Sequence, residues 1–136
     1  ASIAITVIAK AATQTVEISA SEFELVSSKA IEETNKGIDF KASQGTVTAN
    51  YVNVFKTQSL TISIASGSIT KIVFTCTVKD TAKGGPGCFE LTSEKGTYSY
   101  SGYNGTWAFD EGTKSITFKA SSNQVRISKF AITYKA

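Results

Sequence analysis

Apolar and polar residues alternate along most of the chain. The clearest runs are SIAITVIA (2–9), QTVEIS (14–19), SLTISIA (59–65), TKIVFTCTV (70–78), KSITFKA (114–120) and QVRISKFAITYK (124–135). A period of two places successive side chains on opposite faces of a strand, so each run predicts a β-strand with one face in the core. In the last run the apolar positions are odd up to Ile127 and even from Phe130 onward, which predicts a β-bulge near Ser128–Lys129.

Glycine- and asparagine-containing turn signals separate these runs at short intervals. DEGTK (110–114) predicts a hairpin turn that places Trp107 and Phe109 opposite Ile116 and Phe118 as one wall of a core. Strands spaced in this way favour an all-β fold, an antiparallel β-sandwich of the jelly-roll or galactose-binding-like kind.

Two segments depart from this pattern. SSKAIEETNKG (27–37) predicts a single helical turn, with Ser28 as its cap and Glu32 and Glu33 in the first turn. Residues 1–12 form either the last strand of a preceding domain plus a linker, or an edge strand of the sandwich itself. The sandwich module is therefore assigned to residues 13–136.

Composition and charge limit the classes of function that the chain can have. The chain has 136 residues, of which 41% are hydrophobic, and a net charge of +3 with both signs interspersed. We therefore expect one domain with a true core, and no basic stripe for nucleic acid. The apolar runs are too short for membrane insertion, and the start lacks the basic region of a signal peptide.

Several kinds of catalytic and metal chemistry are not expected. There is no histidine and there are two cysteines, which excludes Ser-His-Asp catalysis and a zinc site of Cys and His ligands. The carboxylate pairs Glu32-Glu33 and Asp110-Glu111 are adjacent in sequence, so on a strand they point to opposite faces. We expect no enzyme and no cofactor, with a structural Ca²⁺ near Glu32, Glu33 or Asp39 as the one alternative.

The stretch GTYSYSGYNGTWAF (96–109) concentrates the aromatic residues, and it has two interpretations. Sugar rings stack their apolar faces on aromatic side chains, whereas amide and hydroxyl groups bind sugar hydroxyls. Tyr100, Tyr103 and Asn104 are therefore the main ligand candidates, and Trp107 is a further one. Trp107 also has the parity of a core residue, and Tyr98 is expected to be packed with its hydroxyl bonded to backbone.

Cys76 has inward parity on a predicted strand, and Cys88 follows a glycine-rich loop. A disulfide between Cys76 and Cys88 is the preferred interpretation for an oxidising compartment, and it would make the loop a rigid projection. The alternative is two free thiols, one of them buried.

Four motifs resemble those of a known family: ITKIVF (69–74), GTY (96–98), GTW (105–107) and RISKFAITY (126–134). Together they resemble a β-sandwich module of multidomain surface and secreted proteins of Bacteroidota, over about residues 15–136. In that family the module follows Ig-like repeats, and ASIAITV (1–7) resembles the closing strand of an Ig-like domain. KDTAKGGPGC (79–88) is longer than the family pattern.

The resemblance implies a non-catalytic module outside the cell or on its surface, attached to neighbouring domains of a larger chain. With the loop aromatics, it leads us to expect a polysaccharide or glycan as the partner. The alternative is a structural or adhesive module of a stalk, a fibre, or a virion or cell surface, acting through protein–protein contacts.

Overall fold

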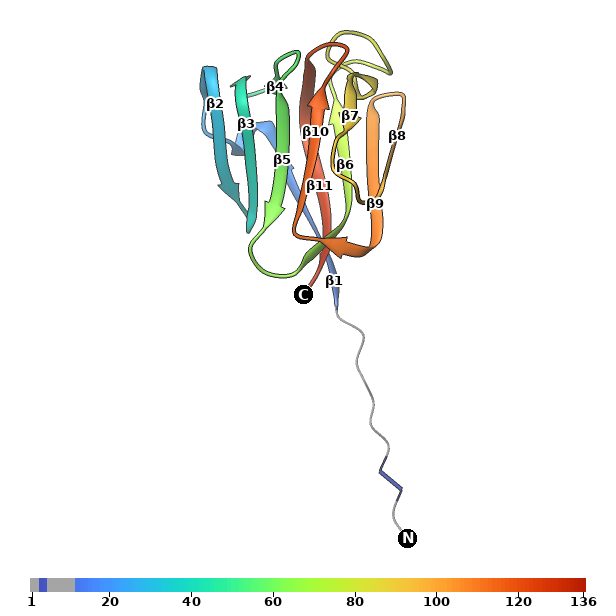
Figure 1. The fold of residues 1–136 in the computed structure, drawn as a ribbon. Coiled ribbons are helices and arrows are strands. Elements are labelled where there is room, and N and C mark those ends of the chain that lie inside the picture. Colours follow the sequence, from blue (N-terminus) through green and yellow to red (C-terminus); the bar gives the residue numbers. More distant parts are fainter. Residues whose placement is uncertain (1–2, 5–11) are drawn as a thin grey trace.

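The computed structural model describes residues 3–4 and 12–136, and its regular structure is almost entirely β (Figure 1). The strands are β1 (Thr13–Ser19), β2 (Val26–Asn35), β3 (Ile38–Val47), β4 (Val52–Val54), β5 (Ser59–Ile64), β6 (Ser68–Cys76), β7 (Phe89–Leu91), β8 (Thr97–Ser101), β9 (Asn104–Thr113), β10 (Ser115–Ala120) and β11 (Val125–Lys135). Two single 3₁₀ turns are η1 (Ala20–Glu22) and η2 (Pro86–Cys88). Most of the strand predicted over 2–9 lies outside the described residues.

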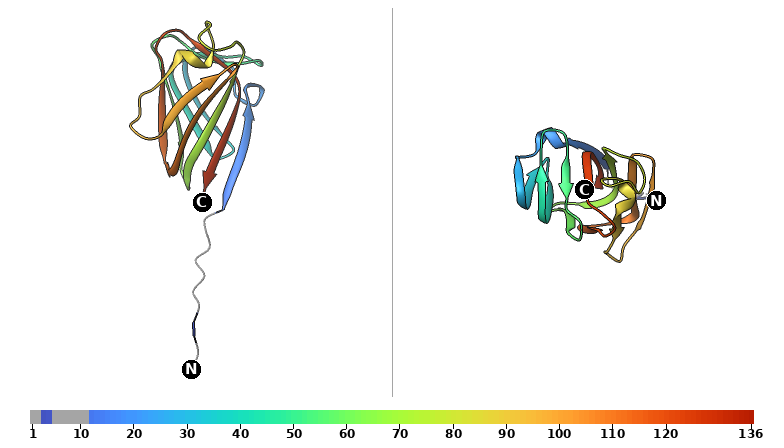
Figure 2. Two further views of the ribbon diagram at one scale, coloured as in Figure 1. Left: turned by 90° about the vertical axis from the view of Figure 1, so that its right-hand side faces the viewer. Right: turned by 90° about the horizontal axis from the view of Figure 1, so that it is seen from above.

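The strands form two walls that face each other (Figure 2). One wall has the order β7-β10-β5-β3-β2, and the other has the order β1-β11-β6-β9-β8. β4 joins them, because it pairs with β3 along one edge and with β11 along the other. In the described part of the chain every strand pair is antiparallel. The predicted all-β antiparallel sandwich is therefore confirmed.

The core fills the space between the walls, as the alternation predicts. In β5 and β10 every second residue is buried, and the inner side chains of both strands have no exposed surface apart from Ile64 at 7%. Aromatic rings connect the two ends of the core, since Phe74 lies 5.7 Å from Phe130 and 4.9 Å from Phe118 between ring centroids. Burial of each such ring contributes about 1.5–3 kcal/mol.

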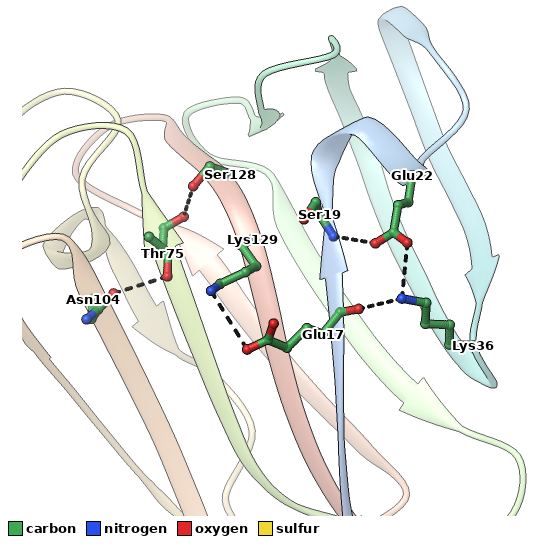
Figure 3. Close-up of polar contacts among 8 residues, drawn as sticks. All are labelled: Glu17, Ser19, Glu22, Lys36, Thr75, Asn104, Ser128 and Lys129. Atoms are coloured by element: carbon green, nitrogen blue, oxygen red, sulfur yellow. Dashed lines mark hydrogen bonds and ion pairs between the residues drawn. The ribbon is translucent and has the colours of Figure 1, made fainter.

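The predicted β-bulge in the last strand is confirmed. Ile127 pairs with Cys76, but the next pair along the ladder joins Lys129 to Thr75, so Ser128 is the extra residue. The Ser128 hydroxyl donates a hydrogen bond of 3.0 Å to the carbonyl of Thr75 (Figure 3). The bulge lets apolar residues on both sides of it face the same core.

The predicted helical turn at 27–37 is wrong. This segment is strand β2, and it turns at Lys36 and Gly37 into β3. Both turn residues have positive φ, 50° and 82°, as in a type I′ hairpin turn. A helix here would expose its few apolar residues, whereas pairing with β3 buries Ile31 to 1% exposure.

The predicted hairpin at DEGTK is also wrong. β9 continues to Thr113 and pairs with β6 and β8, whereas β10 pairs with β5 and β7. The chain therefore crosses from one wall to the other at this point. A register shift in the β6–β9 ladder and Gly112 at φ 77° allow the bend. Trp107 and Phe118 still line one core, but they do so from opposite walls.

The two ends of the sandwich differ in what they carry. The start of β1 and the C-terminus lie at the lower end in Figure 1. The connections 48–51, 77–88, 102–103 and 121–124 lie at the opposite end, which we call the apex. In the described residues no helix has the length and apolar character needed to cross a membrane.

Candidate functional site

The aromatic stretch forms the hairpin of β8 and β9. Ser101 pairs with Asn104, so the turn consists of Gly102 and Tyr103. Gly102 has φ 60°, which fits the first central position of a type II′ turn. Because directly paired residues of antiparallel strands share a face, Tyr100 lies on the same face as its partner Gly105. Gly105 is buried, so this is the inner face.

Tyr98 and Trp107 form a cross-strand pair on the inner face, with Trp107 in the core and the half-buried Tyr98 packed against it. Trp107 has no exposed surface, and its indole Nε1–H donates a 2.9 Å hydrogen bond to the carbonyl of Lys95. The Tyr98 hydroxyl donates to the carbonyl of Pro86 at 2.7 Å, as expected for a packed tyrosine, and burial raises its pKa. Trp107, predicted as a ligand residue, therefore offers no surface to a ligand in this conformation.

The GTY and GTW motifs depend on each other. A Cβ atom at Gly96 would overlap the indole of Trp107, and a Cβ atom at Gly105 would overlap the phenol ring of Tyr98. The glycine of each motif thus makes room for the aromatic residue of the other. The pair of motifs is explained by packing, and it fixes the hairpin over the core.

A groove follows the line where the edges of the two walls meet, between β7 and β8. Its volume is about 620 Å³, and it is lined by Phe89, Glu90, Leu91, Gly96, Thr97, Tyr98, Ser99 and Tyr100. Among the described residues, β7 pairs only with β10 and β8 only with β9, so both strands turn an unpaired backbone edge toward it. We call it the seam groove.

Tyr100 is the exposed aromatic residue of the seam groove, with 45% of its surface accessible. Its ring rests against Gly87 of η2, where a Cβ atom would lie 2.9 Å from Tyr100 Cζ. The carboxylate of Glu90 is held by the hydroxyl of Ser121 at 2.7 Å. Sequence reasoning did not find Glu90, Thr97 and Ser99, because ordinary strand residues give no signal until β7 and β8 are brought together.

The other two predicted ligand residues lie elsewhere. Tyr103 is 46% exposed at the apex, with Lys79 Nζ 5.5 Å from its ring centroid. Asn104 lies on the outer face of its wall, where its Oδ1 accepts a 3.2 Å hydrogen bond from the Thr75 hydroxyl (Figure 3). The predicted site of Tyr100, Tyr103 and Asn104 is therefore divided among three places.

The predicted disulfide is not present. Cys76 and Cys88 are both free and buried, with 3% and 1% of their surfaces exposed. The Cys88 thiol donates to the carbonyl of Ala82 at 3.4 Å, and burial raises the pKa of Cys76 to about 12. The Cys76 thiol therefore stays protonated at neutral pH, and both cysteines serve as buried packing groups.

Backbone hydrogen bonds hold the glycine-rich loop without a disulfide. Asp80 and Gly102 exchange two bonds, from Asp80 N–H to the Gly102 carbonyl and from Gly102 N–H to the Asp80 carboxylate, at 2.8 and 2.9 Å. Gly84 receives a bond from Arg126 N–H and donates to the carbonyl of Gln124. The loop is thus fixed to both neighbouring connections of the apex, which makes a covalent link unnecessary for its position.

The carboxylates considered for Ca²⁺ do not converge. Asp39 accepts a hydrogen bond of 2.6 Å from the Thr34 hydroxyl, and Glu33 accepts one of 2.9 Å from the N–H of Glu24. In the described ranges no three potential ligands gather in a way that would hold a metal ion.

No protein-family model matches the chain, and no curated protein matches it either. The geometry of the seam groove and of the apex is therefore the basis for any functional assignment.

Proposed function

We propose that this chain is a non-catalytic carbohydrate-binding module of a bacterial secreted or surface protein, and that the seam groove is its binding site. The observation that carries the proposal is the position of Tyr100, a half-exposed aromatic ring on the wall of an open groove. Polar residues line the same groove, namely Glu90, Thr97 and Ser99, together with two unpaired strand edges.

This combination suits a sugar. A pyranose ring has an apolar C–H face that packs on an aromatic ring, and hydroxyls around its rim that both donate and accept hydrogen bonds. A carboxylate accepts two such hydroxyls, while free backbone N–H and C=O groups serve the others. The Ser121 hydroxyl and Gly87 fix Glu90 and Tyr100 beforehand, so little order has to be created on binding.

The position of the groove also fits a module within a longer chain. The start of β1 and the C-terminus lie at the end of the sandwich opposite the apex (Figures 1 and 2). Neighbouring domains attached at that end would leave the apex and the upper part of the seam groove clear. A bound polysaccharide would then be held away from the rest of the protein.

A structural or adhesive module acting through its sheet edges is less well supported. β2 is the outer strand of its wall, and among the described residues its only strand partner is β3. It carries two register shifts, Ser28 at φ 48°, and the charged residues Lys29 and Glu32. Such features prevent edge-to-edge pairing of sheets.

The proposal is tested by glycan binding with a matched pair of variants. A panel of neutral polysaccharides is screened by affinity electrophoresis, and binders are measured by isothermal titration calorimetry. Tyr100→Ala should weaken binding at least about tenfold, as expected for loss of the main stacking surface. Leu25→Ala, which removes a 75% exposed apolar side chain far from the groove, should leave the affinity unchanged.

Thermal unfolding of both variants checks that the fold is retained. A panel without any binder, or a binder that loses equal affinity in both variants, would contradict the assignment of the seam groove.

A further inference from the structure

The apex carries an excess of positive charge. Its connections and the first residues of β11 contain Lys79, Lys83 and Arg126 against Asp80, and one further carboxylate, that of Glu90, reaches the apex at Ser121. The Asp80 carboxylate is occupied by the N–H of Gly102. The local field at the apex therefore favours anions.

Two of these cations are paired with aromatic rings. Lys79 Nζ lies 5.5 Å from the ring centroid of Tyr103, and Arg126 Cζ lies 4.8 Å from that of Tyr51. Thr77 N–H donates to the Arg126 carbonyl, and Cys76 N–H donates to the Tyr103 carbonyl. The two pairs therefore lie on neighbouring segments and form one strip, which we call the apex strip.

Arg126 is held in place from three sides. Its aliphatic stem packs on Gly84, where a Cβ atom would lie 3.5 Å from Arg126 Cγ, and its guanidinium lies over Tyr51. In the amide orientation that satisfies both groups, the Gln124 side-chain oxygen accepts bonds from Arg126 Nε and Nη2 at 2.9 and 3.0 Å. The remaining guanidinium N–H groups are left for another acceptor.

The cations of the strip also differ from two lysines outside the apex. Lys36 and Lys129 each pair with a glutamate, at 3.0 and 3.8 Å. Across residues 12–136 no carboxylate pairs with Lys79 or Arg126 within 4.0 Å. Positioned cations without an anionic partner lie beside an exposed ring, Tyr103, and a half-buried one, Tyr51. Such groups are suited to bind an anionic group on a ligand that also has an apolar face.

We propose that the apex strip is a second subsite, which binds the carboxylate or sulfate group of an acidic polysaccharide. The inference rests on the proposed function, since it names the class of glycan. Lys79 and Arg126 bind the anionic group, and Tyr51 and Tyr103 pack against the sugar rings on either side. The seam groove holds a neutral part of the same class of ligand.

The test compares polymers that differ only in charge. Dextran sulfate is compared with dextran for the sulfate, and polygalacturonate with fully methyl-esterified polygalacturonate for the carboxylate. At low ionic strength the charged member of at least one pair should bind about tenfold more tightly, and the difference should shrink as salt is added. The preferred pair identifies the anionic group. Polyglutamate, a polyanion without sugar rings, should bind weakly.

Variants locate the effect. Lys79→Gln and Arg126→Gln should each weaken binding of the charged polymer about three- to fivefold. Lys71→Gln, which removes an equal charge from the outer face of β6, is the matched control and should have no effect. Lys79 is exposed, so its variant remains informative even if Arg126→Gln disturbs the packing on Gly84.

The two proposals fail in different ways. Equal binding of charged and uncharged polymers, equal losses in Lys79→Gln and Lys71→Gln, or tight binding of polyglutamate would overturn the apex strip and leave the seam groove intact. Loss of neutral-glycan binding in Tyr100→Ala reports on the seam groove alone. If only charged polymers bind, and Tyr100→Ala binds them normally, the apex strip stands and the seam groove does not.

Discussion

The hairpins β2–β3 and β8–β9 have turns of equal length at opposite ends of the sandwich. At the β2–β3 turn the side chain folds back onto the protein. Lys36 Nζ donates to the carbonyl of Glu17 at 2.7 Å and pairs with Glu22 at 3.0 Å (Figure 3). Glu22 in turn accepts the N–H of Ser19 at 2.8 Å. This end satisfies its own polar groups and ties β2 and β3 to β1.

At the β8–β9 turn the backbone is fixed and the side chain is left free. Gly102 bonds with Asp80 through both its N–H and its carbonyl, while Tyr103 remains 46% exposed. The two turns teach that exposure at the apex does not come from a loose backbone. At the apex the internal hydrogen bonds fix the backbone, and the aromatic and cationic side chains remain available to a ligand.

The largest expected effect is a difference in stability between two variants of the β8–β9 hairpin, one at the buried Trp107 and one at Tyr103 in the turn. Trp107→Ala should lower the free energy of unfolding by about 3–5 kcal/mol, because it leaves a cavity behind the hairpin and an unpaired Lys95 carbonyl. Tyr103→Ala should change it by less than about 0.5 kcal/mol, since Tyr103 lies in the turn with 46% of its surface exposed and fills no part of the core. Urea denaturation measures both. Similar losses in the two variants would contradict the division into a packed and a presenting face.

The next prediction compares glycines near the two hairpins. Gly96→Ala should cost about 2–4 kcal/mol, because Gly96 has φ 86° and its Cβ would overlap the Trp107 indole. Gly37→Ala should cost about 1 kcal/mol, since φ is 82° there but no atom lies within 4 Å of the new Cβ. Urea denaturation of the two variants measures this difference. Equal costs would mean that the reciprocal packing of GTY and GTW contributes little.

The sequence predicted those features that depend on local period. Alternation gave the sandwich, and the parity change at Ile127 and Phe130 located the bulge at Ser128. It did not predict the crossing at DEGTK, because a glycine turn looks the same whether the next strand pairs with its neighbour or joins the opposite wall. For 27–37, local helix preference was outweighed by pairing with β3.

The candidate site was predictable only in part. Tyr100 was correctly expected to be accessible, but its separation from Tyr103 and Asn104 depends on strand parity and on the register of the turn. Glu90 comes from β7, which belongs to the other wall, and only the meeting of the two walls brings it to the groove that Tyr100 lines. The disulfide prediction, made from the parity of Cys76 and the position of Cys88 after the loop, was wrong: both thiols are free, and hydrogen bonds to Gly102, Gln124 and Arg126 hold the loop.

The buried thiols give a prediction about chemical reactivity. Alkylation of the folded protein at neutral pH should be slow at both Cys76 and Cys88, because they are buried and the Cys76 pKa is raised to about 12. Denaturation without a reductant should expose two reactive thiols, which mass spectrometry counts as two adducts. If the denatured protein reacts with the alkylating agent only after a reductant is added, a disulfide is present.

The same burial predicts alkaline destabilisation. The pKa of Cys76 is raised by burial from its ordinary value of 9.0, and that of Tyr98 is raised by burial too. The folded state therefore holds protons that the unfolded state releases, so the contribution of these two groups to the free energy of unfolding should be constant below pH 9 and fall above it. Cys76→Ala should reduce this fall, as measured by urea denaturation across the alkaline range. An unchanged slope would show that the thiol ionises at the same pH in the folded and the unfolded protein.

The smallest expected effect concerns the polar contacts of the β2–β3 end. Hydrogen bonds from Ser19 N–H and Lys36 lower the pKa of Glu22, so this exposed carboxylate stabilises the fold above its ordinary pKa of 4.5. That contribution is lost as the pH falls through the lower folded value. Glu22→Gln should thus melt slightly earlier than the wild type at neutral pH and coincide with it in acid. An equal difference in melting temperature between the variant and the wild type at both pH values would argue against the contacts of Glu22 with Ser19 and Lys36.

The position of a bound glycan tests the central claim most directly. A titration of ¹⁵N-labelled protein with a bound polysaccharide fragment, followed by amide chemical shifts, reports every contact at once. We predict shifts concentrated at residues 89–91 and 96–100, with an acidic fragment adding changes at Lys79, Tyr103 and Arg126, and none at Lys36 or Gly37. Shifts confined to the β2–β3 end or to the outer faces of the walls would contradict the account.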